Sequence, residues 1–293
     1  MTLLAYLLLS GLTTGALYAL IALGIVVVNK ATGVINFAHG ELFMFSGFFA
    51  WMLHVQMGVP YLPALLLAVA FGFMLGVLID LTAFRPLKNS DVISLVLATI
   101  GIAFMLRGTA RVLWGGKSDY LPFPPITSPE PVMIGELMVI PQQLLVLAGA
   151  IVIMLVFAAF FRLTRAGKMM QATADNAKAS TLVGIRVDRI YMLSFGTGAA
   201  IAAAAAVLMA PLTLLYPDMG FSFFIKGFAA AVLGGLTSLP GAVVGGVAIG
   251  VIEALAGGYL HSSFIEVSAF IVIMFVLIAR PTGLFGPSGL RRV

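Results

Sequence analysis

Long apolar runs, separated by short polar stretches, set the pattern of the 293-residue chain. Most of these runs are long enough to cross a bilayer core of about 30 Å as helices. The pattern predicts an all-α, polytopic transmembrane bundle of eight to nine spans, forming one membrane domain over residues 1–293. The apolar segments lie at about 3–28, 34–53, 61–83, 92–113, 141–161, 190–210, 223–257 and 264–279.

The seventh apolar segment is too long for a single crossing, because about 35 residues of helix would measure roughly 52 Å. It contains GGLTSLPGAVVGG (residues 234–246), which is rich in helix breakers. A split at 239–241 gives nine crossings, although a re-entrant segment over 234–246 stays an alternative. We predict interrupted helices at Gly33, Gly40, Gly220, Gly227, Gly234, Gly235, Pro240 and Gly241.

Composition narrows the class of protein. Residues are 61% hydrophobic and only 9% charged, whereas soluble domains carry about 25% charged residues. The chain has no cysteine, which excludes disulfides and thiol catalysis. The histidines His39, His54 and His261 are scattered, so we expect no metal site. Because no nucleophile and base stand together, we also expect no enzyme.

Basic residues orient the spans, since they concentrate in cytoplasmic loops. An N-terminus outside and a C-terminus in the cytoplasm place most of them on the inner side. Arg107, Arg111 and Lys117 then fall at or beyond the outer face, and Lys226 falls within a span. The predicted inner set is Lys30, Arg85, Lys88, Arg162, Arg165, Lys168, Lys178, Arg186, Arg189, Arg280, Arg291 and Arg292.

Two stretches share a pattern, GVINFAHGE (33–41) and GFSFFIKGF (220–228). Each follows a helix rich in small residues, and the topology runs the two copies in opposite directions. Such matches indicate an inverted repeat, a common transporter plan. The alternative is that glycine-rich composition, which is frequent in packed membrane helices, produces the match. The alignment pairs Gly33 with Gly220, Phe37 with Phe224, His39 with Lys226, Gly40 with Gly227 and Gly47 with Gly234.

Four polar residues lie within these apolar stretches: Asn36, His39, Glu41 and Lys226. Polar groups inside a membrane are usually functional or paired, so they could line or gate a pathway. The alternative is structural, with Glu41 and His39 at a helix start favoured by the dipole and Asn36 as its cap.

Three acidic residues elsewhere near the spans have simpler interpretations. We expect Glu253 and Glu266 to be solvated near the outer face. Asp80 lies near Arg85 in sequence, so we expect a local ion pair between them. None of the three is predicted to be functional.

The two longest polar loops could each bind a partner. The outer loop, 114–140, contains PFPPITSPEP and then VMIGELMVI, which predicts a small β-hairpin around Gly135 and Glu136. It is either a docking surface or an ordered connector.

The inner loop, 162–188, contains DNAKASTLVG, which predicts a short helix with Asn176 or Asp175 as N-cap and Gly184 beyond its end. Ala179, Leu182 and Val183 would share one face. The helix could dock into a partner's groove or lie at the lipid interface.

Several motifs together resemble the permease subunits of high-affinity branched-chain amino-acid ABC transporters. They are GLTTGALYALIALG, GVINFAHGELFMFSG, AFRPLKNSD with LATIGIAF, VLGGLTSLPGAVVGG and RPTGLFG, in an order that spans nearly the whole chain. The chain looks like the shorter of the two paired permeases of that family. The resemblance implies a bacterial inner-membrane protein that forms the pathway for branched-chain or related hydrophobic amino acids.

The resemblance also implies partners. Importer permeases carry a cytoplasmic coupling helix with the pattern E-A-A-x-x-x-G, whose spacing is kept here with Lys178 in place of Glu and Ser180 in place of the second Ala. The segment would comprise Lys178, Ala179, Ser180, Leu182, Val183 and Gly184. The implied partners are two ATPase subunits, a second homologous permease and an extracytoplasmic binding protein. This chain lacks a phosphate-binding loop, so ATP would be used by the ATPases alone.

Two other functions remain open from the sequence. Related permeases are thought to move urea or short amides. A self-sufficient secondary transporter driven by an ion gradient could instead use Glu41 and His39 as proton carriers. Of these alternatives, only an ABC importer requires the segment 162–188 to bind an ATPase.

Overall fold

Helices make up most of the computed structural model, which describes residues 2–115, 120–128, 130–134 and 137–286. Two short antiparallel strands are β1 (Val132–Ile134) and β2 (Leu137–Val139). The α-helices are α1 (Thr2–Thr32), α2 (His39–Trp51), α3 (Tyr61–Ile79), α4 (Arg85–Leu87), α5 (Val92–Trp114), α6 (Pro141–Leu163), α7 (Arg165–Asp175), α8 (Ala177–Leu182), α9 (Val187–Met209), α10 (Met219–Gly234), α11 (Leu239–Tyr259) and α12 (Phe264–Ala279). Shorter pieces extend three of them: π-helical η1 (Met52–Gln56) and η2 (Asp80–Phe84), and 3-10 helix η3 (Ala210–Leu212).

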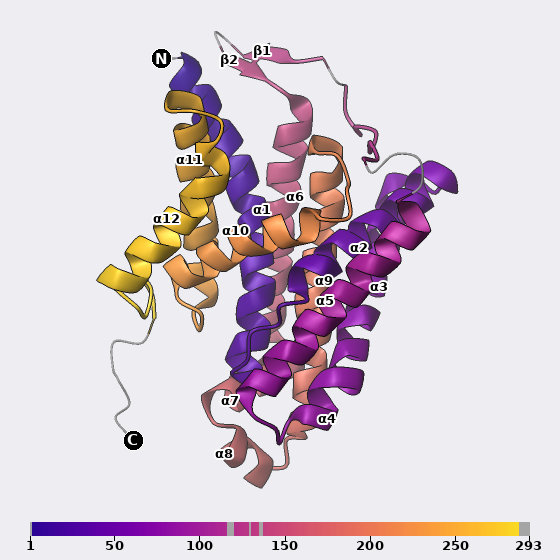
Figure 1. Ribbon diagram of the computed structural model, residues 1–293, viewed down its shortest axis with the longest axis vertical. Coiled ribbons are helices and arrows are strands. Elements are labelled where there is room, and N and C mark those ends of the chain that lie inside the picture. The colour runs from indigo at the N-terminus through magenta and orange to yellow at the C-terminus, as the bar shows by residue number, and fades with distance from the viewer. Residues whose placement is uncertain (1, 116–119, 129, 135–136, 287–293) are drawn as a thin grey trace.

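The predicted polytopic helical bundle is confirmed. Among the described residues, six helices are long and apolar enough to cross a membrane, and α10 and α12 are shorter apolar helices. Figure 1 shows α1 running from the end that carries β1 and β2 toward the end that carries α7 and α8. The predicted eight to nine spans are therefore approximate, because some crossings are built from short pieces.

Helices α2 and α10 are too short to cross the bilayer alone. Their 13 and 16 residues correspond to about 20 and 24 Å of helix, against a core of about 30 Å. Each follows a non-helical segment, 33–38 before α2 and 213–218 before α10. Both helices therefore begin inside the bundle, where neighbouring helices satisfy the irregular backbone.

The two short helices begin against each other. A Cβ at Gly40 would collide with the carbonyl oxygen of Gly220, and a Cβ at Gly220 would lie 2.7 Å from the carbonyl oxygen of Gly40. This reciprocal backbone contact is what two copies related by a pseudo-twofold axis would make. Only glycine at both positions permits it.

The helices around α2 and α10 are related by the same pseudo-twofold axis. Helix α1 packs mainly against α11, and α9 packs mainly against α3. Gly246 and Gly250 of α11 abut α1, while Gly72 and Gly76 of α3 abut α9. Each pair is a G-x-x-x-G spacing that allows close helix approach. The predicted inverted repeat is thus present, with α1, α2 and α3 matching α9, α10 and α11.

The residue-by-residue alignment of the repeat is wrong by seven positions. Because α2 begins at His39 and α10 at Met219, the helix starts match Gly40 with Gly220 and Gly47 with Gly227. His39 therefore corresponds to Met219 and not to Lys226. The error arose because glycines recur every seven residues in both copies, so a shift of seven still matches them.

The predicted helix breaks divide into two groups. Gly33 and Gly235 adopt positive φ values of 74° and 103° outside the helices. Gly234 ends α10, and Pro240 and Gly241 lie in the first turn of α11.

Gly40 and Gly220 likewise lie in the first turns of α2 and α10, directly after non-helical segments, whereas the predicted break at Gly227 is wrong because it lies within α10. Gly227 is a packing position instead. A Cβ there would meet the side chain of Ile21 in α1. The helix continues through it because glycine is needed for the approach of α1 and not for a turn.

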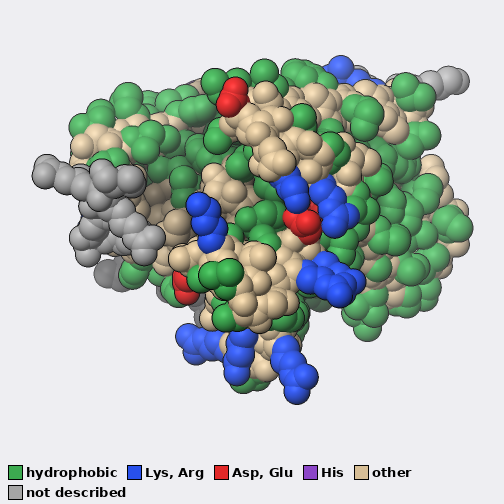
Figure 2. Space-filling view, turned by 90° about the horizontal axis from the view of Figure 1, so that it is seen from below, with side chains coloured by type: hydrophobic (Ala, Val, Ile, Leu, Met, Phe, Trp, Pro, Cys, Tyr) green, Lys and Arg blue, Asp and Glu red, His purple; other side chains and the backbone are tan. Residues whose placement is uncertain are grey.

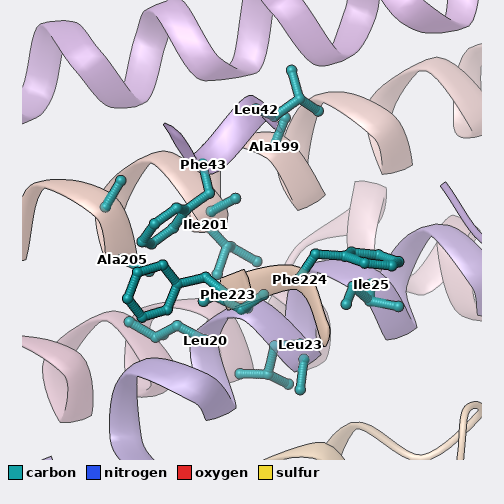
Figure 3. Close-up of a cluster of buried hydrophobic side chains, with 14 of the residues drawn as sticks. Leu20, Leu23, Ile25, Leu42, Phe43, Ala199, Ile201, Ala205, Phe223 and Phe224 are labelled. Carbon is teal, nitrogen blue, oxygen red and sulfur yellow. The ribbon is translucent and has the colours of Figure 1, made fainter. Parts of the chain in front are cut away.

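The core lies where α1, α2, α9 and α10 meet (Figure 3). Phe43 and Phe223, which are equivalent positions of the repeat, have ring centroids 5.1 Å apart. Small residues of α9, such as Ala199 and Ala205, are fully buried and leave room for these rings. Helices α5 and α12 instead expose large apolar side chains, which fits an outer position in lipid or against another chain.

The end of the molecule opposite the α7–α8 end is closed by the segment between α5 and α6. Strands β1 and β2 pair in register from Val132 with Val139, while Gly135 and Glu136 lie outside the described residues. Leu121 forms an antiparallel bridge with Leu215 in the segment before α10. The indole N–H of Trp51 donates to the carbonyl of Pro122 at 2.9 Å. This segment therefore braces the start of α10 and the end of α2.

We predict that Gly40→Val destabilises the protein, because its side chain would collide with the backbone of α10. Overpacking of this kind costs about 1–3 kcal/mol or more. Gly101→Ala is the matched control, since no atom lies within 4 Å of a Cβ there. Thermal unfolding of the purified protein in detergent measures the effect. Equal melting temperatures for Gly40→Val and the wild type would contradict the close contact.

Candidate functional site

Four charged side chains meet where α2 and α10 begin and α5 nears its end. Arg107 Nε donates to Glu41 Oε1 at 3.2 Å, and the Arg107 Nη2 also bonds that oxygen. Arg107 Nη1 lies 3.6 Å from Asp218 Oδ1. Arg111 Nη2 donates to both carboxylate oxygens of Asp218, at 2.8 and 2.7 Å. We call these four residues the charge quartet.

The charge quartet runs from the interior to the surface. Its side chains are 2% exposed at Glu41, 21% at Arg107, 53% at Asp218 and 57% at Arg111. Acidic and basic groups alternate along this line, and two carboxylates balance two guanidinium groups. A balanced set is the arrangement in which buried charges are tolerated.

Local sequence explains why these groups meet. Arg107 and Arg111 are four residues apart, so they project from the same face of α5. Glu41 lies in the first turn of α2 and Asp218 directly precedes α10. Acidic groups are favoured at both places by the positive ends of the helix dipoles. The close approach of Gly40 and Gly220 brings the two helix starts within reach of one arginine pair.

A pocket of about 390 Å³ opens beside the quartet. Its walls are the starts of α2 and α10 and one face of α5. The second carboxylate oxygen of Glu41, Oε2, has no hydrogen-bond partner among the described residues. Apart from Glu41 and Arg107 the lining is apolar: Phe37, Gly40, Ile100, Ala103, Phe104, Phe221 and Phe224.

Of the other predicted polar residues, Asn36 and His39 lie near Glu41 but do not line this pocket. Asn36 Oδ1 accepts the backbone N–H of Ala38 at 3.0 Å and so holds the turn before α2. His39 is fully buried and packs against Gly24 of α1. Asn36 thus holds the turn but does not cap α2 as the structural alternative expected, since the N-cap position is Ala38 without a side-chain cap bond. His39 has a packing role.

Lys226 belongs to a different cluster. Its Nζ bonds Glu253 Oε1 at 2.7 Å and lies 3.4 Å from Glu266 Oε1. The ammonium also lies 5.8 Å from the ring centroid of Tyr18. Lys226 thus ties α10 to α11, α12 and α1. It does not share the pocket beside Glu41.

Two predictions about acidic residues are wrong. Glu253 is 7% exposed and paired with Lys226, not solvated. Asp80 is buried, and the described residues form no salt bridge between it and Arg85. The nearby ion pair is instead between Lys88 and Asp188 at 2.8 Å.

The inner loop forms a short exposed helix at the far end of the molecule. Asn176 caps α8 by accepting the N–H of Ala179 at 2.9 Å, and Gly184 follows with φ of 87°. Leu182 and Val183 are 88% and 78% exposed, whereas Ser180 faces inward. Lys178 and Ala179 are also exposed. The predicted cap and stop signals are confirmed, and the helix presents an apolar tip.

Exposed basic residues surround this tip, and Figure 2 shows them from below. They come from α4, α6, α7, α8 and the start of α9. The set is Arg85, Lys88, Arg162, Arg165, Lys168, Lys178, Arg186 and Arg189, all exposed. The predicted residues Lys117, Arg291 and Arg292 lie outside the described residues.

Sequence reasoning missed Arg107, Arg111 and Asp218 as site residues. The two arginines were expected at or beyond the outer face, but Arg107 lies two turns before the end of α5 and pairs with Glu41. Their spacing of four residues was the available signal. The partner on α2 is 66 residues away in the chain, which no local pattern reveals.

We predict that Lys226→Met strongly destabilises the protein, because it leaves the Glu253 carboxylate buried without its partner. Breaking one side of a buried pair costs about 3–5 kcal/mol. The double variant Lys226→Met with Glu253→Leu should recover much of this loss. Thermal unfolding in detergent compares them. If the double variant were less stable than Lys226→Met, the pairing would not explain the effect.

Comparisons with known proteins agree with this architecture. The family model for the permease component of branched-chain amino acid transport systems matches residues 7–279. The permease LivH of Salmonella typhimurium is 32% identical over 97% of this chain and 96% of its own length. BraD of Pseudomonas aeruginosa is 33% identical over 98% and 97%. Both are named as high-affinity branched-chain amino acid transport system permease proteins.

A solved structure shows the same fold at low sequence identity. PsaBC from Streptococcus pneumoniae, in complex with a Fab, aligns with a TM-score of 0.52 at 12% identity. The alignment covers 97% of this chain and 94% of that one. Together, the family match and the full-length relatives establish that the chain belongs to the family of branched-chain amino acid transport permeases.

Proposed function

We propose that this chain is a permease subunit of a binding-protein-dependent ABC importer, carrying branched-chain or related hydrophobic amino acids across the bacterial inner membrane. The observation that carries the proposal is the full-length match to permeases of that named function. The relatives are transport permeases and not enzymes. The chain therefore supplies a route, and ATP is bound and used by partner ATPase subunits.

The charge quartet supports a route along the face of α5. Charged groups within the membrane face a water-filled cavity or another chain, because lipid cannot solvate them. Arg111 and Asp218 are more than half exposed on this face, which supports a face turned toward water or another chain. A second homologous permease opposite α5 and the start of α10 would enclose the pocket and complete the pathway.

The ion-coupled alternative has less support from the site. Glu41 is held in an ion pair with Arg107, as part of a charge quartet that needs no bound proton for balance. His39 is buried against α1 and has no contact with the pocket. A transporter that moves urea or short amides would have little use for four charges at its pocket.

Orientation follows from the distribution of charge. The exposed basic residues gather at the α7–α8 end (Figure 2), and such residues are typical of the cytoplasmic side. The start of α1 lies at the other end (Figure 1). Phe285 lines a cavity with Lys30 at the α7 end. We therefore place the N-terminus outside and the segment near Phe285 at the cytoplasmic face.

Each end then has its own partner. The α8 tip, with Leu182 and Val183 exposed, would dock into a groove of the ATPase as a coupling helix. The outer segment that carries β1 and β2 would receive the binding protein. These two surfaces lie at opposite ends of the molecule. This is the arrangement expected of an importer that receives its cargo outside and is driven by ATP hydrolysis inside.

The test of the proposal is purification from the native membrane in mild detergent, followed by reconstitution. We expect an ATPase and a second permease to copurify, and the vesicles to take up leucine only with ATP and the binding protein. Uptake by this chain alone, driven by an ion gradient, would overturn the proposal.

A second prediction concerns the coupling helix. Leu182→Glu combined with Val183→Glu should release the ATPase, because two charges replace the apolar tip that would enter its groove. Met57→Glu is the control, since Met57 is 64% exposed at the opposite end. Pull-down of the ATPase with tagged permease measures the difference. Retention of the ATPase by the double variant would place the contact elsewhere.

A further inference from the structure

We infer that the pocket beside the charge quartet is a binding station for a zwitterionic aliphatic amino acid, held by both of its backbone charges. The inference rests on the proposed function and adds a recognition site within this chain. It concerns where the cargo is held after the binding protein has released it. Three features of the pocket support it: an unpaired acceptor, a balanced set of charges and an apolar wall.

The unpaired acceptor is Glu41 Oε2. Glu41 is 2% exposed, yet this oxygen has no hydrogen-bond partner among the described residues. A buried acceptor without a donor is unfavourable, and more so when it is charged. Its neighbour Oε1 is occupied by Arg107. The ammonium group of an amino acid has the donors and the charge that Oε2 lacks.

The basic side of the station is Arg107, which lines the pocket, and Arg111 lies beyond it and shares Asp218 with Arg107. Both guanidinium groups contact Asp218, so they form a donor row extending from Glu41 toward the surface. Arginine presents its donors in a planar fork that fits a carboxylate. An amino acid places its carboxylate close to its ammonium. It can therefore reach Arg107 and Glu41 together.

The charge balance selects a neutral zwitterion. The quartet sums to zero, so a ligand with one positive and one negative group leaves the sum unchanged. A ligand with a net charge would add an unbalanced charge to a partly buried site, which is unfavourable. Urea and short amides would leave the Glu41 charge without an ionic partner at Oε2. The site therefore discriminates by paired charges and not by polarity alone.

The remaining wall fits an aliphatic side chain. Ile100, Phe104, Phe221 and Phe224 surround the polar end with apolar surface. The volume of about 390 Å³ falls within the range of about 300–1,000 Å³ typical of small-molecule sites. Because α2, α5 and α10 all contribute, a bound amino acid would contact both half-helices and α5 at once.

The absence of cysteine in this chain makes a direct test practical. Ala103→Cys places a single thiol in the pocket wall, and labelling with a small maleimide in the assembled transporter reports its accessibility. We expect millimolar leucine to slow labelling at least threefold, without binding protein or ATP. Ser262→Cys, in the exposed turn between α11 and α12, is the control and should label at the same rate with or without leucine.

Analogues of leucine that lack one backbone charge test the contribution of each charge separately. 4-Methylpentanoate lacks the ammonium, 3-methylbutylamine lacks the carboxylate, and neither should protect Ala103→Cys. Glu41→Gln should abolish protection by leucine in complexes that still retain their partner subunits. Equal protection by leucine and by either analogue, or by urea, would overturn the station. The comparison of analogues needs no substitution at Glu41. It therefore remains a valid test even if the Glu41→Gln variant does not assemble with its partners.

ATP-dependent leucine uptake by the same Ala103→Cys complex, measured in parallel, separates this inference from the proposed function. ATP-dependent leucine uptake without protection of the thiol by leucine would overturn the proposed binding station and leave the proposed transport function intact. Protection together with uptake would support both. An absence of ATP-dependent uptake in the wild-type complex would overturn the proposed function itself.

Discussion

The contact between Gly40 and Gly220 is the constraint on which the rest of the structure depends. It brings the starts of α2 and α10 together inside the bundle, backbone against backbone. The positive ends of two helix dipoles then converge, which favours acidic groups there. Glu41 and Asp218 occupy those places, and Arg107 and Arg111 of α5 balance them. The close approach of two glycines thus leads directly to a charged pocket in an apolar bundle.

Helix α10 is held at three places along its length. Its start is tied to α5 through Asp218, and its middle to α11 through Lys226 and Glu253. At its end, the N–H groups of Leu284 and Phe285 donate to the carbonyls of Leu233 and Gly234, at 2.8 and 3.1 Å. These last bonds satisfy carbonyls that any helix end leaves without intrahelical partners. The R-P-T-G-L-F-G motif therefore serves as a cap for α10.

How much the sequence predicts depends on how local each interaction is. Apolar runs revealed the long spans, and the Asn176 cap with Gly184 revealed α8, because those signals lie within one segment. The pairing of Glu41 with Arg107 joins residues 66 positions apart, and Lys226 joins Glu253 across 27. Pairs of residues so far apart in the sequence leave no local pattern that identifies them. The repeat was found but misaligned, since a heptad spacing of glycines fits two registers equally well.

The segment that caps the end of α10 also faces a cavity at the α7 end of the molecule. Phe285, which bonds Gly234, lines one cavity together with Lys30 of α1, Asp175 of α7 and Thr237. Asp175 ends α7, immediately before the Asn176 cap of α8. A shift of α8 would therefore act on α7, which lines this cavity together with the segment that caps α10. Since α10 begins at the charge quartet and ends at Gly234, this one helix joins the proposed pocket to the cavity that Phe285 shares with Asp175 of α7.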